Sequence, residues 1–194
     1  MAEASLKMTD DRREQVLRAA ERSFIASGFH GARMAQIAKE AKMSAGHIYH
    51  YFESKEQIIA EMIRSHFEEK MATLERYRDA GDRVVDLMIE NLTNSVATNT
   101  DPFWSTLMLE IAAEATRNAE IASSLRSMDA EMKSRVLGYL RSGLNQDDLD
   151  TRLEIFVALM QGLGMRNIIN PNLDKDAVIH ITRDIVELLF RRRT

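Results

Sequence analysis

The side chains best suited to recognise another molecule cluster between Arg33 and Glu56. Ser44 is a favourable N-cap residue, so we expect a short helix to begin there and to turn Ile48 inward. The opposite side of this helix would carry small, polar and aromatic residues, namely Ala45, Gly46, His47, Tyr49 and His50. A helix that is buried on one face and offers hydrogen-bonding groups on the other fits a DNA major groove.

These residues would divide the contacts with DNA between them. Because Gly46 has no side chain, the backbone there could approach DNA closely. Tyr49 and His50 lie on turns adjacent to Ala45 and His47 and could reach phosphates or base edges. Lys55 would stand in the first turn of the next helix, where free N–H groups and a positive side chain form a seat for a phosphate.

Two other interpretations of this stretch stay open. His47 and His50 are three residues apart and could ligate a metal, but no third His, Cys or acidic ligand is evident nearby. Any three-helix module could show the same apolar stripes, and helix-turn-helix patterns produce false matches. A helical protein-interaction module that binds no operator is therefore the alternative function. We expect neither a metal nor a cofactor.

The composition predicts a helical protein with a substantial core. The chain has 194 residues, 45% hydrophobic and 29% charged, with only 8 Gly and 2 Pro, which favours an all-α chain of one or two domains. It contains no cysteine, which removes disulfides and thiolate chemistry and fits a reducing cytosol. The polar N-terminus lacks the apolar region of a signal peptide, and no apolar run could span a bilayer. We therefore expect a cytoplasmic protein without a membrane partner.

The net charge argues mildly against a nucleic-acid partner, so its distribution matters more. The whole chain carries a formal charge of −4. Residues 1–60 hold nine Lys/Arg and eight Asp/Glu, whereas the remainder holds 17 and 22. An N-terminal part that is less acidic than the rest is a weak indication of an anionic partner there.

Apolar stripes and cap residues predict about nine helices and no strand. Gly28 would end the first helix, Gly81 would follow the fourth, and Asp101-Pro102 is the sharpest start signal. The first three helices would form a helix-turn-helix DNA-binding domain over residues 1–54, followed by a ligand-binding and dimerisation domain over residues 55–194. The expected helices cover about residues 10–27, 34–41, 44–52, 55–79, 84–96, 102–116, 119–142, 148–169 and 174–193.

The first 60 residues resemble the tetracycline-repressor (TetR) family. The resemblance rests on Gly28-Phe29, on the stretch from Ser44 to Phe52 and on Ser54-Lys55-Glu56, and it is specific over about residues 10–60. Beyond that range it rests on length and on the all-helical pattern. It implies a three-helix DNA-binding domain, a divergent ligand-binding domain and a homodimer built largely by the final two helices. It also implies repression of transcription that a small molecule relieves.

Four positions depart from the family pattern. The family commonly has Ser or Thr where Arg33 stands, so a cap is lost, at about 1 kcal/mol, and a phosphate contact can be gained. It often has Gly at Lys42, so either the backbone there avoids positive φ or some strain is tolerated. Ala45 replaces a frequent basic residue and His47 a frequent Thr. The operator sequence is therefore unreadable by analogy, and the predicted DNA-binding set is Arg33, Lys42, Ser44, Ala45, Gly46, His47, Tyr49, His50 and Lys55.

The middle of the chain is rich in methionine and aromatic residues. Flexible thioethers suit a pocket that adapts to a small, largely apolar effector, although each Met could equally be core filler. Glu114 could orient a cationic or hydroxylated ligand if it points inward, or could lie on a solvated face with Arg117. The predicted ligand-binding set is Met88, Leu92, Val96, Phe103, Trp104, Leu107, Met108, Ile111, Glu114, Met128 and Met132.

The last two helices carry the signals of a dimer. Gly162 and Gly164 are unfavourable inside a helix, which indicates a bend or the close approach of another helix. The final helix has a wider apolar face than one neighbour would cover, which favours a four-helix dimer interface over a monomeric bundle. The predicted interface is Phe156, Met160, Leu163, Gly164, Ile181, Ile185, Leu188 and Leu189.

Together these features predict a DNA-binding repressor that binds a near-palindromic operator as a homodimer and is released by a small-molecule effector. An enzyme is disfavoured because the chain has no cysteine, no Gly-rich phosphate loop, no metal constellation and no nucleophile elbow. The direction of regulation rests on the family resemblance alone.

Overall fold

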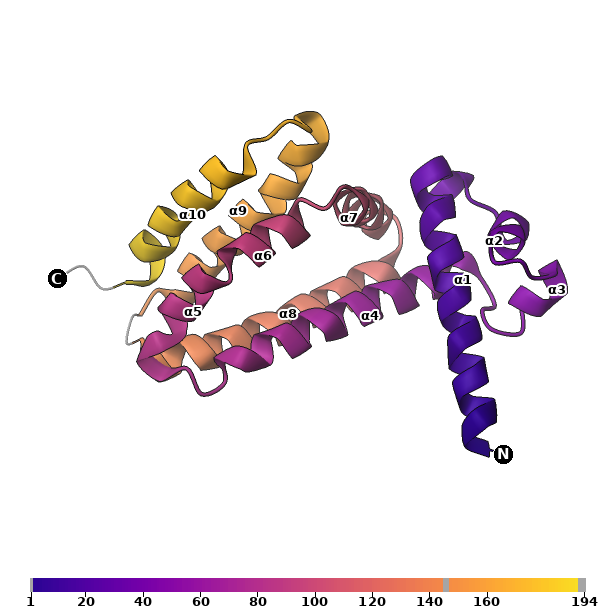
Figure 1. Ribbon diagram of the computed structural model, residues 1–194, viewed down its shortest axis with the longest axis horizontal. Coiled ribbons are helices and arrows are strands. Elements are labelled where there is room, and N and C mark those ends of the chain that lie inside the picture. Colours follow the sequence, from indigo (N-terminus) through magenta and orange to yellow (C-terminus); the bar gives the residue numbers. More distant parts are fainter. Residues whose placement is uncertain (1, 145–146, 192–194) are drawn as a thin grey trace. The chain divides into compact units, whose positions relative to one another are not determined.

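The computed structural model describes residues 2–144 and 147–191, and within them it contains ten α-helices, two short 3-10 helices and no strand (Figure 1). The all-α prediction is confirmed. The described residues fall into two compact units, 1–68 and 69–194, and the helix α4 (Lys55–Leu74) is continuous from the first to the second. The domain boundary expected between residues 54 and 55 falls directly before Lys55, the first residue of α4.

The first unit is a three-helix domain closed by the start of α4. Its helices are α1 (Ala2–Gly31), α2 (Met34–Glu40) and α3 (Ala45–Ile48). The contacts between α1, α2 and α3 bury Val16, Phe24, Ile37 and Ile48 almost completely. These residues recur at helical spacing, so each helix turns one apolar stripe toward the others.

Two backbone positions with positive φ shape this unit. Gly28 has φ 67° and ψ 168°, a conformation open essentially to glycine alone, and it kinks α1 three residues before the helix ends. Lys42 has φ 53°, so strain is tolerated at the position where the family often has glycine. The Met43 N–H donates to the Ala38 carbonyl (2.9 Å) and the Lys42 N–H to the Lys39 carbonyl (3.0 Å), which makes the end of α2 a Schellman motif.

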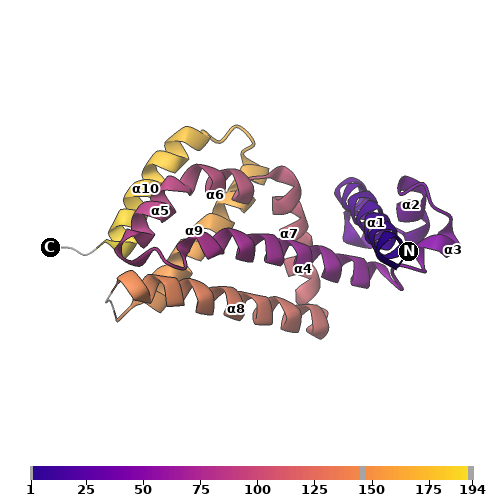
Figure 2. The ribbon, with the colours of Figure 1, turned by 60° about the horizontal axis from the view of Figure 1, so that its bottom comes forward.

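The second unit is a helical bundle around one core. Figures 1 and 2 show α10 along one side of it and α8 along the other, with α6 and α9 between them. Leu92, Leu140, Leu149, Val186 and Phe190 are among its most deeply buried side chains. Its further helices are α5 (Val84–Glu90), α6 (Leu92–Asn99), α7 (Pro102–Ala115), α8 (Ala119–Gly143), α9 (Leu149–Ile169) and α10 (Lys175–Phe190).

Side-chain caps begin three of these helices where the sequence has Asp or Asn. Asp101 accepts from the Trp104 N–H (3.0 Å), Asn118 from the Ile121 N–H (3.2 Å) and Asp174 from the Ala177 N–H (3.0 Å). The start of α7 at Asp101-Pro102 is thus confirmed.

Several predicted helices differ from the structure. The first begins at Ala2, not near residue 10, and the third ends at Ile48, not near residue 52. The helix expected to run to about residue 79 ends at Leu74 and continues as a 3-10 turn over Glu75–Tyr77. The single helix expected over 84–96 is two helices, α5 and α6, which meet at Asn91. Asn91 accepts from the Arg76 guanidinium (2.7 Å) and donates to the Ser95 hydroxyl (3.2 Å), contacts that apolar periodicity does not reveal.

Gly164 makes room for neighbours within the chain, whereas Gly162 does not. A Cβ atom on Gly164 would lie 2.7 Å from the Asn99 carbonyl oxygen and 3.1 Å from the Ser105 hydroxyl. A Cβ on Gly162 would meet nothing within 4 Å. The close approach predicted from these glycines is therefore found at Gly164, where α9 packs on the turn between α6 and α7.

The described helices include none that is both long and apolar enough to cross a membrane.

A pair of alanine substitutions two residues apart tests this packing. Gly164→Ala should destabilise the fold by about 1–3 kcal/mol, because a backbone carbonyl must move to admit the methyl group. Gly162→Ala should leave stability unchanged or raise it by up to about 1 kcal/mol through helix propensity. Urea denaturation of both variants provides the measurement, and equal effects would contradict the internal contact.

Candidate DNA-binding surface and ligand cavity

The residues predicted to contact DNA lie together on an exposed surface around α3. Eight of them are exposed (Arg33, Lys42, Ser44, Ala45, Gly46, His47, Tyr49 and His50), and only Lys55 is half-buried. Between them Ile48 is fully buried. One side of this segment is therefore fixed in the core, and the other faces solvent. Their contact with DNA stays a prediction.

Ser44 and two aromatic contacts set the shape of this short segment. The Ser44 hydroxyl accepts from the His47 N–H (3.2 Å), which caps α3. The Tyr51 hydroxyl and His47 Nε2 are 3.3 Å apart, and the His50 and Tyr51 rings pack edge to face with centroids 5.3 Å apart. Arg33 precedes α2 without a side-chain cap, as its replacement of Ser or Thr predicts.

Long side chains of α1 bind the carbonyl groups left open where α2 and α3 end. Gln15 donates to the Ala41 carbonyl (2.8 Å), and Arg13 donates to the Tyr51 carbonyl (3.0 Å). The Arg13 guanidinium also lies 4.6 Å above the Phe52 ring and 3.6 Å from the Glu61 carboxylate. These contacts satisfy backbone acceptors that a four-residue helix cannot satisfy alone.

Lys55 has an internal role that its sequence position did not indicate. Its ammonium donates to the carbonyls of Phe29 (2.7 Å), Ala32 (3.2 Å) and His30 (3.4 Å), and it lies 4.6 Å from the Phe29 ring centroid. An ammonium has three N–H donors, and these contacts occupy all of them. The ammonium therefore joins the end of α1 to the start of α4, and the predicted phosphate seat would rely on the backbone N–H groups.

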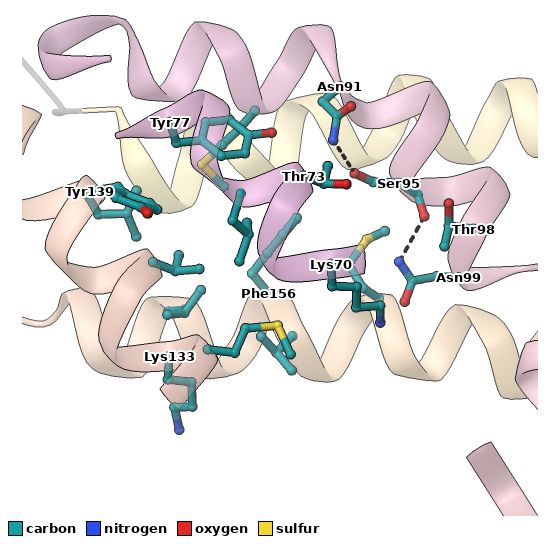
Figure 3. Close-up of a pocket in the computed structure, with 18 of the residues that line it drawn as sticks. Lys70, Thr73, Tyr77, Asn91, Ser95, Thr98, Asn99, Lys133, Tyr139 and Phe156 are labelled. Atoms are coloured by element: carbon teal, nitrogen blue, oxygen red, sulfur yellow. Dashed lines mark hydrogen bonds between the residues drawn. The ribbon is translucent and has the colours of Figure 1, made fainter. Parts of the chain in front are cut away.

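The second unit contains a cavity of about 270 Å³, large enough for a small organic molecule. It lies between the end of α4, α5, α6, α8 and α9 (Figure 3). Its apolar wall is Leu74, Val84, Met88, Met132, Val136, Leu140, Leu153, Phe156, Val157 and Met160. Its polar wall is Lys70, Thr73, Tyr77, Asn91, Asn94, Ser95, Thr98, Asn99, Asp129, Lys133, Tyr139 and Gln161.

Of the predicted ligand-binding residues, only Met88 and Met132 line this cavity. Leu92 and Val96 lie on the opposite face of α6, buried in the core. Leu107 and Ile111 are buried on α7, which packs on α8 and α9. The others outside the cavity lining are Phe103, Trp104, Met108, Glu114 and Met128.

Glu114 forms the ion pair considered for it from the sequence. Its carboxylate lies 3.1 Å from the Arg117 guanidinium.

The sequence does contain the signal for the cavity side of α6. Asn91, Asn94, Ser95, Thr98 and Asn99 recur at the spacing of one helical face. The ligand-binding prediction used the apolar stripe of α6, which packs in the core. The polar stripe of the same helix faces the cavity.

Phe156 and Met160, predicted for the dimer interface, also belong to the cavity lining.

Charged residues at the cavity differ in their partners. Lys133 pairs with Glu154, and this contact, together with Asp129 nearby, raises the pKa of Lys133. Lys70 is partly buried, and burial alone lowers its pKa, with no carboxylate opposing the shift. Burial also raises the pKa of the Tyr77 hydroxyl. Among the lining residues that the structure describes, Lys70 is thus a half-buried cation without an acidic partner.

The predicted dimer residues separate into exposed and internal sets. Ile181 and Leu188 are 56% and 54% exposed and lie on one face of α10, with the half-buried Ile185 between them. Gly164 and Met160 are buried within the chain. The apolar residues of α9 that are at least 40% exposed are Ile155, Met165, Ile168 and Ile169, none of which was predicted.

An exposed recognition-type helix in one unit and a ligand-sized cavity in the other define a ligand-responsive DNA-binding transcriptional regulator. The chain belongs to the tetR family of bacterial regulatory proteins, whose N-terminal model matches residues 16–62. A second model, described as the C-terminal part of BetI-type transcriptional repressors, matches residues 80–191. The predicted family is confirmed, and so is the predicted class of protein. These matches favour a transcriptional regulator over an enzyme or a protein-interaction module.

Relatives in sequence agree with this assignment. The HTH-type transcriptional regulator UidR of Escherichia coli K12 is 31% identical over 140 residues, covering 71% of this chain and 68% of UidR. The regulator BetI of Vibrio campbellii is 24% identical over 192 residues, covering 93% and 92% of the two chains.

Solved structures share the fold over nearly the whole chain. GusR of Salmonella enterica aligns with a TM-score of 0.73 and 25% identity, covering 94% of this chain and 96% of GusR. A transcriptional regulator from Saccharomonospora viridis, solved in complex with choline, aligns with a TM-score of 0.71 and 23% identity, covering 92% and 96%.

The two roles of Lys55 can be separated by substitution. Lys55→Met should lower the stability of the first unit by about 1–3 kcal/mol, because buried carbonyls lose a charged donor. Lys39→Met, at an exposed lysine of the same unit, should change stability by less than about 0.5 kcal/mol. Thermal denaturation measures both. A variant of normal stability whose DNA affinity loses about one unit of salt dependence would instead assign Lys55 to a phosphate.

Proposed function

We propose that this protein is a dimeric repressor that reads its operator through α3 and leaves it when an effector fills the cavity of the second unit. The observation that supports this most directly is the exposed set around α3, on a segment that belongs to a tetR-type DNA-binding domain. The place of action would be the cytoplasm, where operators are found.

The DNA contact would follow the geometry of helix-turn-helix dimers. Each α3 would enter a major groove, and the two grooves would lie roughly 34–36 Å apart on a near-palindromic site. His47, Tyr49 and His50 would reach bases and phosphates, while the exposed cations Arg33 and Lys42 would neutralise phosphates.

The exposed apolar residues of α9 and α10 support the proposed dimer. Ile181 and Leu188 on α10, with Ile155 and Ile169 on α9, would leave a large apolar surface in water in a monomer. A second copy of the chain would cover this surface by a two-fold axis.

Helix α4 would couple the effector to DNA. It carries Lys55 at its start, bound to the end of α1, and it carries Lys70, Thr73 and Leu74 to the cavity. An effector would release DNA only if it bound the released arrangement more tightly than the operator-bound one. Similar folds hold unlike ligands, since FadR of Bacillus subtilis was solved with stearoyl-CoA (TM-score 0.75, 16% identity), so the fold does not set the effector.

The DNA-binding assignment is tested by a triple substitution. Genomic footprinting would first supply the operator. His47→Ala, Tyr49→Ala and His50→Ala together should weaken operator binding by at least about 100-fold, since each base contact contributes about 1–3 kcal/mol. Arg126→Ala, which removes an exposed cation of the second unit, should bind like the original protein. Unchanged operator binding by a folded triple variant would refute the assignment.

The dimer is tested by charge at its expected centre. Ile181→Glu with Leu188→Glu should give a folded monomer in analytical ultracentrifugation at micromolar concentration, because two carboxylates would be buried without partners. Ile25→Glu is a matched control, since Ile25 is 53% exposed in the first unit. If both variants remain dimeric, the interface lies elsewhere.

A further inference from the structure

We propose that the effector of this chain is an amphipathic organic anion whose head group binds Lys70 and the polar face of α6, and whose apolar body lies against α8 and α9. The inference rests on the proposed function, because it takes the cavity as the effector site. It goes further in naming the charge, the orientation and the anchor of the ligand. An apolar effector, as the sequence predicted, would leave this polar wall unused.

No carboxylate among the described residues neutralises the Lys70 ammonium in the cavity lining. In the described part of the chain, no hydrogen bond or ion pair satisfies its ammonium, although most of the side chain is buried. Burial of an unpaired cation is costly, and the lowered pKa of Lys70 reflects that cost. A protein that keeps such a group in a cavity gains from it when a ligand supplies the opposite charge.

Lys133, the other cation in the cavity lining, already has a carboxylate partner. Lys133 pairs with Glu154 on α9, and Asp129 acts on the same lysine. Figure 3 shows Lys133 directed away from the cavity, while Lys70 stands at the end where Thr98 and Asn99 lie. An anion entering the cavity would therefore meet one unopposed positive charge, and a cationic ligand would be repelled by it.

Neutral hydrogen-bonding groups of α6 lie at the same end of the cavity as Lys70 (Figure 3). Asn99 donates to the Ser95 carbonyl (2.8 Å), which fixes its amide with the oxygen and a second N–H left for a ligand. Thr98 and Asn94 line the cavity on the same face of α6. Groups of this kind match a carboxylate with a hydroxyl close to it.

Apolar side chains make up another part of the cavity lining. Met88, Met132, Phe156 and Met160 present flexible and aromatic surface without charge. Tyr77 and Tyr139 stand at the far end of the cavity from Lys70 (Figure 3), and the Tyr139 hydroxyl already donates to Glu75 (3.2 Å). A ligand with a charged head and an apolar tail would fill both halves.

Three probes of equal chain length separate these features. Octanoate, octan-1-ol and octyltrimethylammonium carry negative, neutral and positive heads on the same apolar body. Titration calorimetry on the full chain should show octanoate binding at least 10-fold tighter than octan-1-ol, and octyltrimethylammonium weakest. Equal or tighter binding of the cation, or no octanoate binding at millimolar concentration, would overturn the inference.

Substitution of Lys70 identifies the anchor. Lys70→Met should weaken octanoate at least 10-fold and leave octan-1-ol unchanged. Lys133→Met is the matched control, since it removes a cation that lines the same cavity but is paired, and it should change octanoate binding less than threefold. Octanoate affinity retained in Lys70→Met, or lost equally in Lys133→Met, would refute the role of Lys70.

The polar face of α6 has its own test. 3-Hydroxyoctanoate should bind about 3–10-fold tighter than octanoate, and Thr98→Val or Ser95→Ala should reduce that gain while leaving octanoate affinity unchanged. Loss of octanoate itself in these variants, or no gain from the hydroxyl, would remove α6 from the head-group site.

The unpaired charge of Lys70 can also be tested without a ligand, by measuring the melting temperature of Lys70→Met. Lys70→Met should melt at a higher temperature than the original protein, because an unpaired buried charge is gone. The folded pKa of Lys70 lies below its unfolded value, so this difference should be full below the lowered pKa and should vanish as pH rises toward about 10.4. The other titratable groups lining the cavity, Asp129, Lys133, Tyr77 and Tyr139, are shared by both proteins and cancel in the comparison. A lower melting temperature in the variant would contradict the isolation of Lys70.

The experiments distinguish a wrong effector class from a wrong proposed function. If the probes behave against expectation while the α3 triple variant loses its operator, the regulator stands and only the effector class is wrong. If that triple variant keeps its operator, the proposed function fails whatever the cavity binds.

Discussion

A helix of four residues has no stability of its own, and α3 depends on its neighbours for its shape. Ile48 anchors it in the core, Ser44 caps its start, and Arg13 from α1 binds the Tyr51 carbonyl just after it ends. In the same unit, Gln15 binds the Ala41 carbonyl at the end of α2, and Lys55 binds the Phe29 carbonyl near the end of α1. Long polar side chains thus fix the local geometry, and small residues such as Ala45 and Gly46 are left free to face a partner.

Helix α4 makes contacts in both units. Its start is bound to the end of α1, and its later residues line the cavity. Its first residue, Lys55, binds the carbonyls that end α1, so a shift of α4 would strain those contacts. Its later residues line the cavity through Lys70, Thr73 and Leu74. In the proposed coupling, a ligand held at that end would act on a helix whose first residues belong to the first unit.

In the second unit, the proposed effector site would set binding against stability. Its core is apolar and tightly packed, with Leu140 and Phe190 fully buried. Next to this core the chain keeps a polar helix face and an unpaired lysine, which a domain selected for stability alone would replace. Residues that weaken the empty protein in this way are typical of binding sites, where the ligand completes the interactions.

The sequence alone determined the helices with strong caps, such as the one that starts at Asp101-Pro102, because capping is local and depends on a few adjacent residues. It also determined the surface around α3, because alternation of buried and exposed residues on a short helix follows from periodicity, and it indicated the tetR family through the motif between Ser44 and Glu56. The tertiary structure decided what depends on which helix packs against which face. Only packing shows that Leu92 and Val96 lie in the core while Ser95 and Asn99 face the cavity, that Gly164 serves an internal contact, and that Lys55 binds carbonyls. These contacts join residues far apart in the chain, so no local pattern could have specified them.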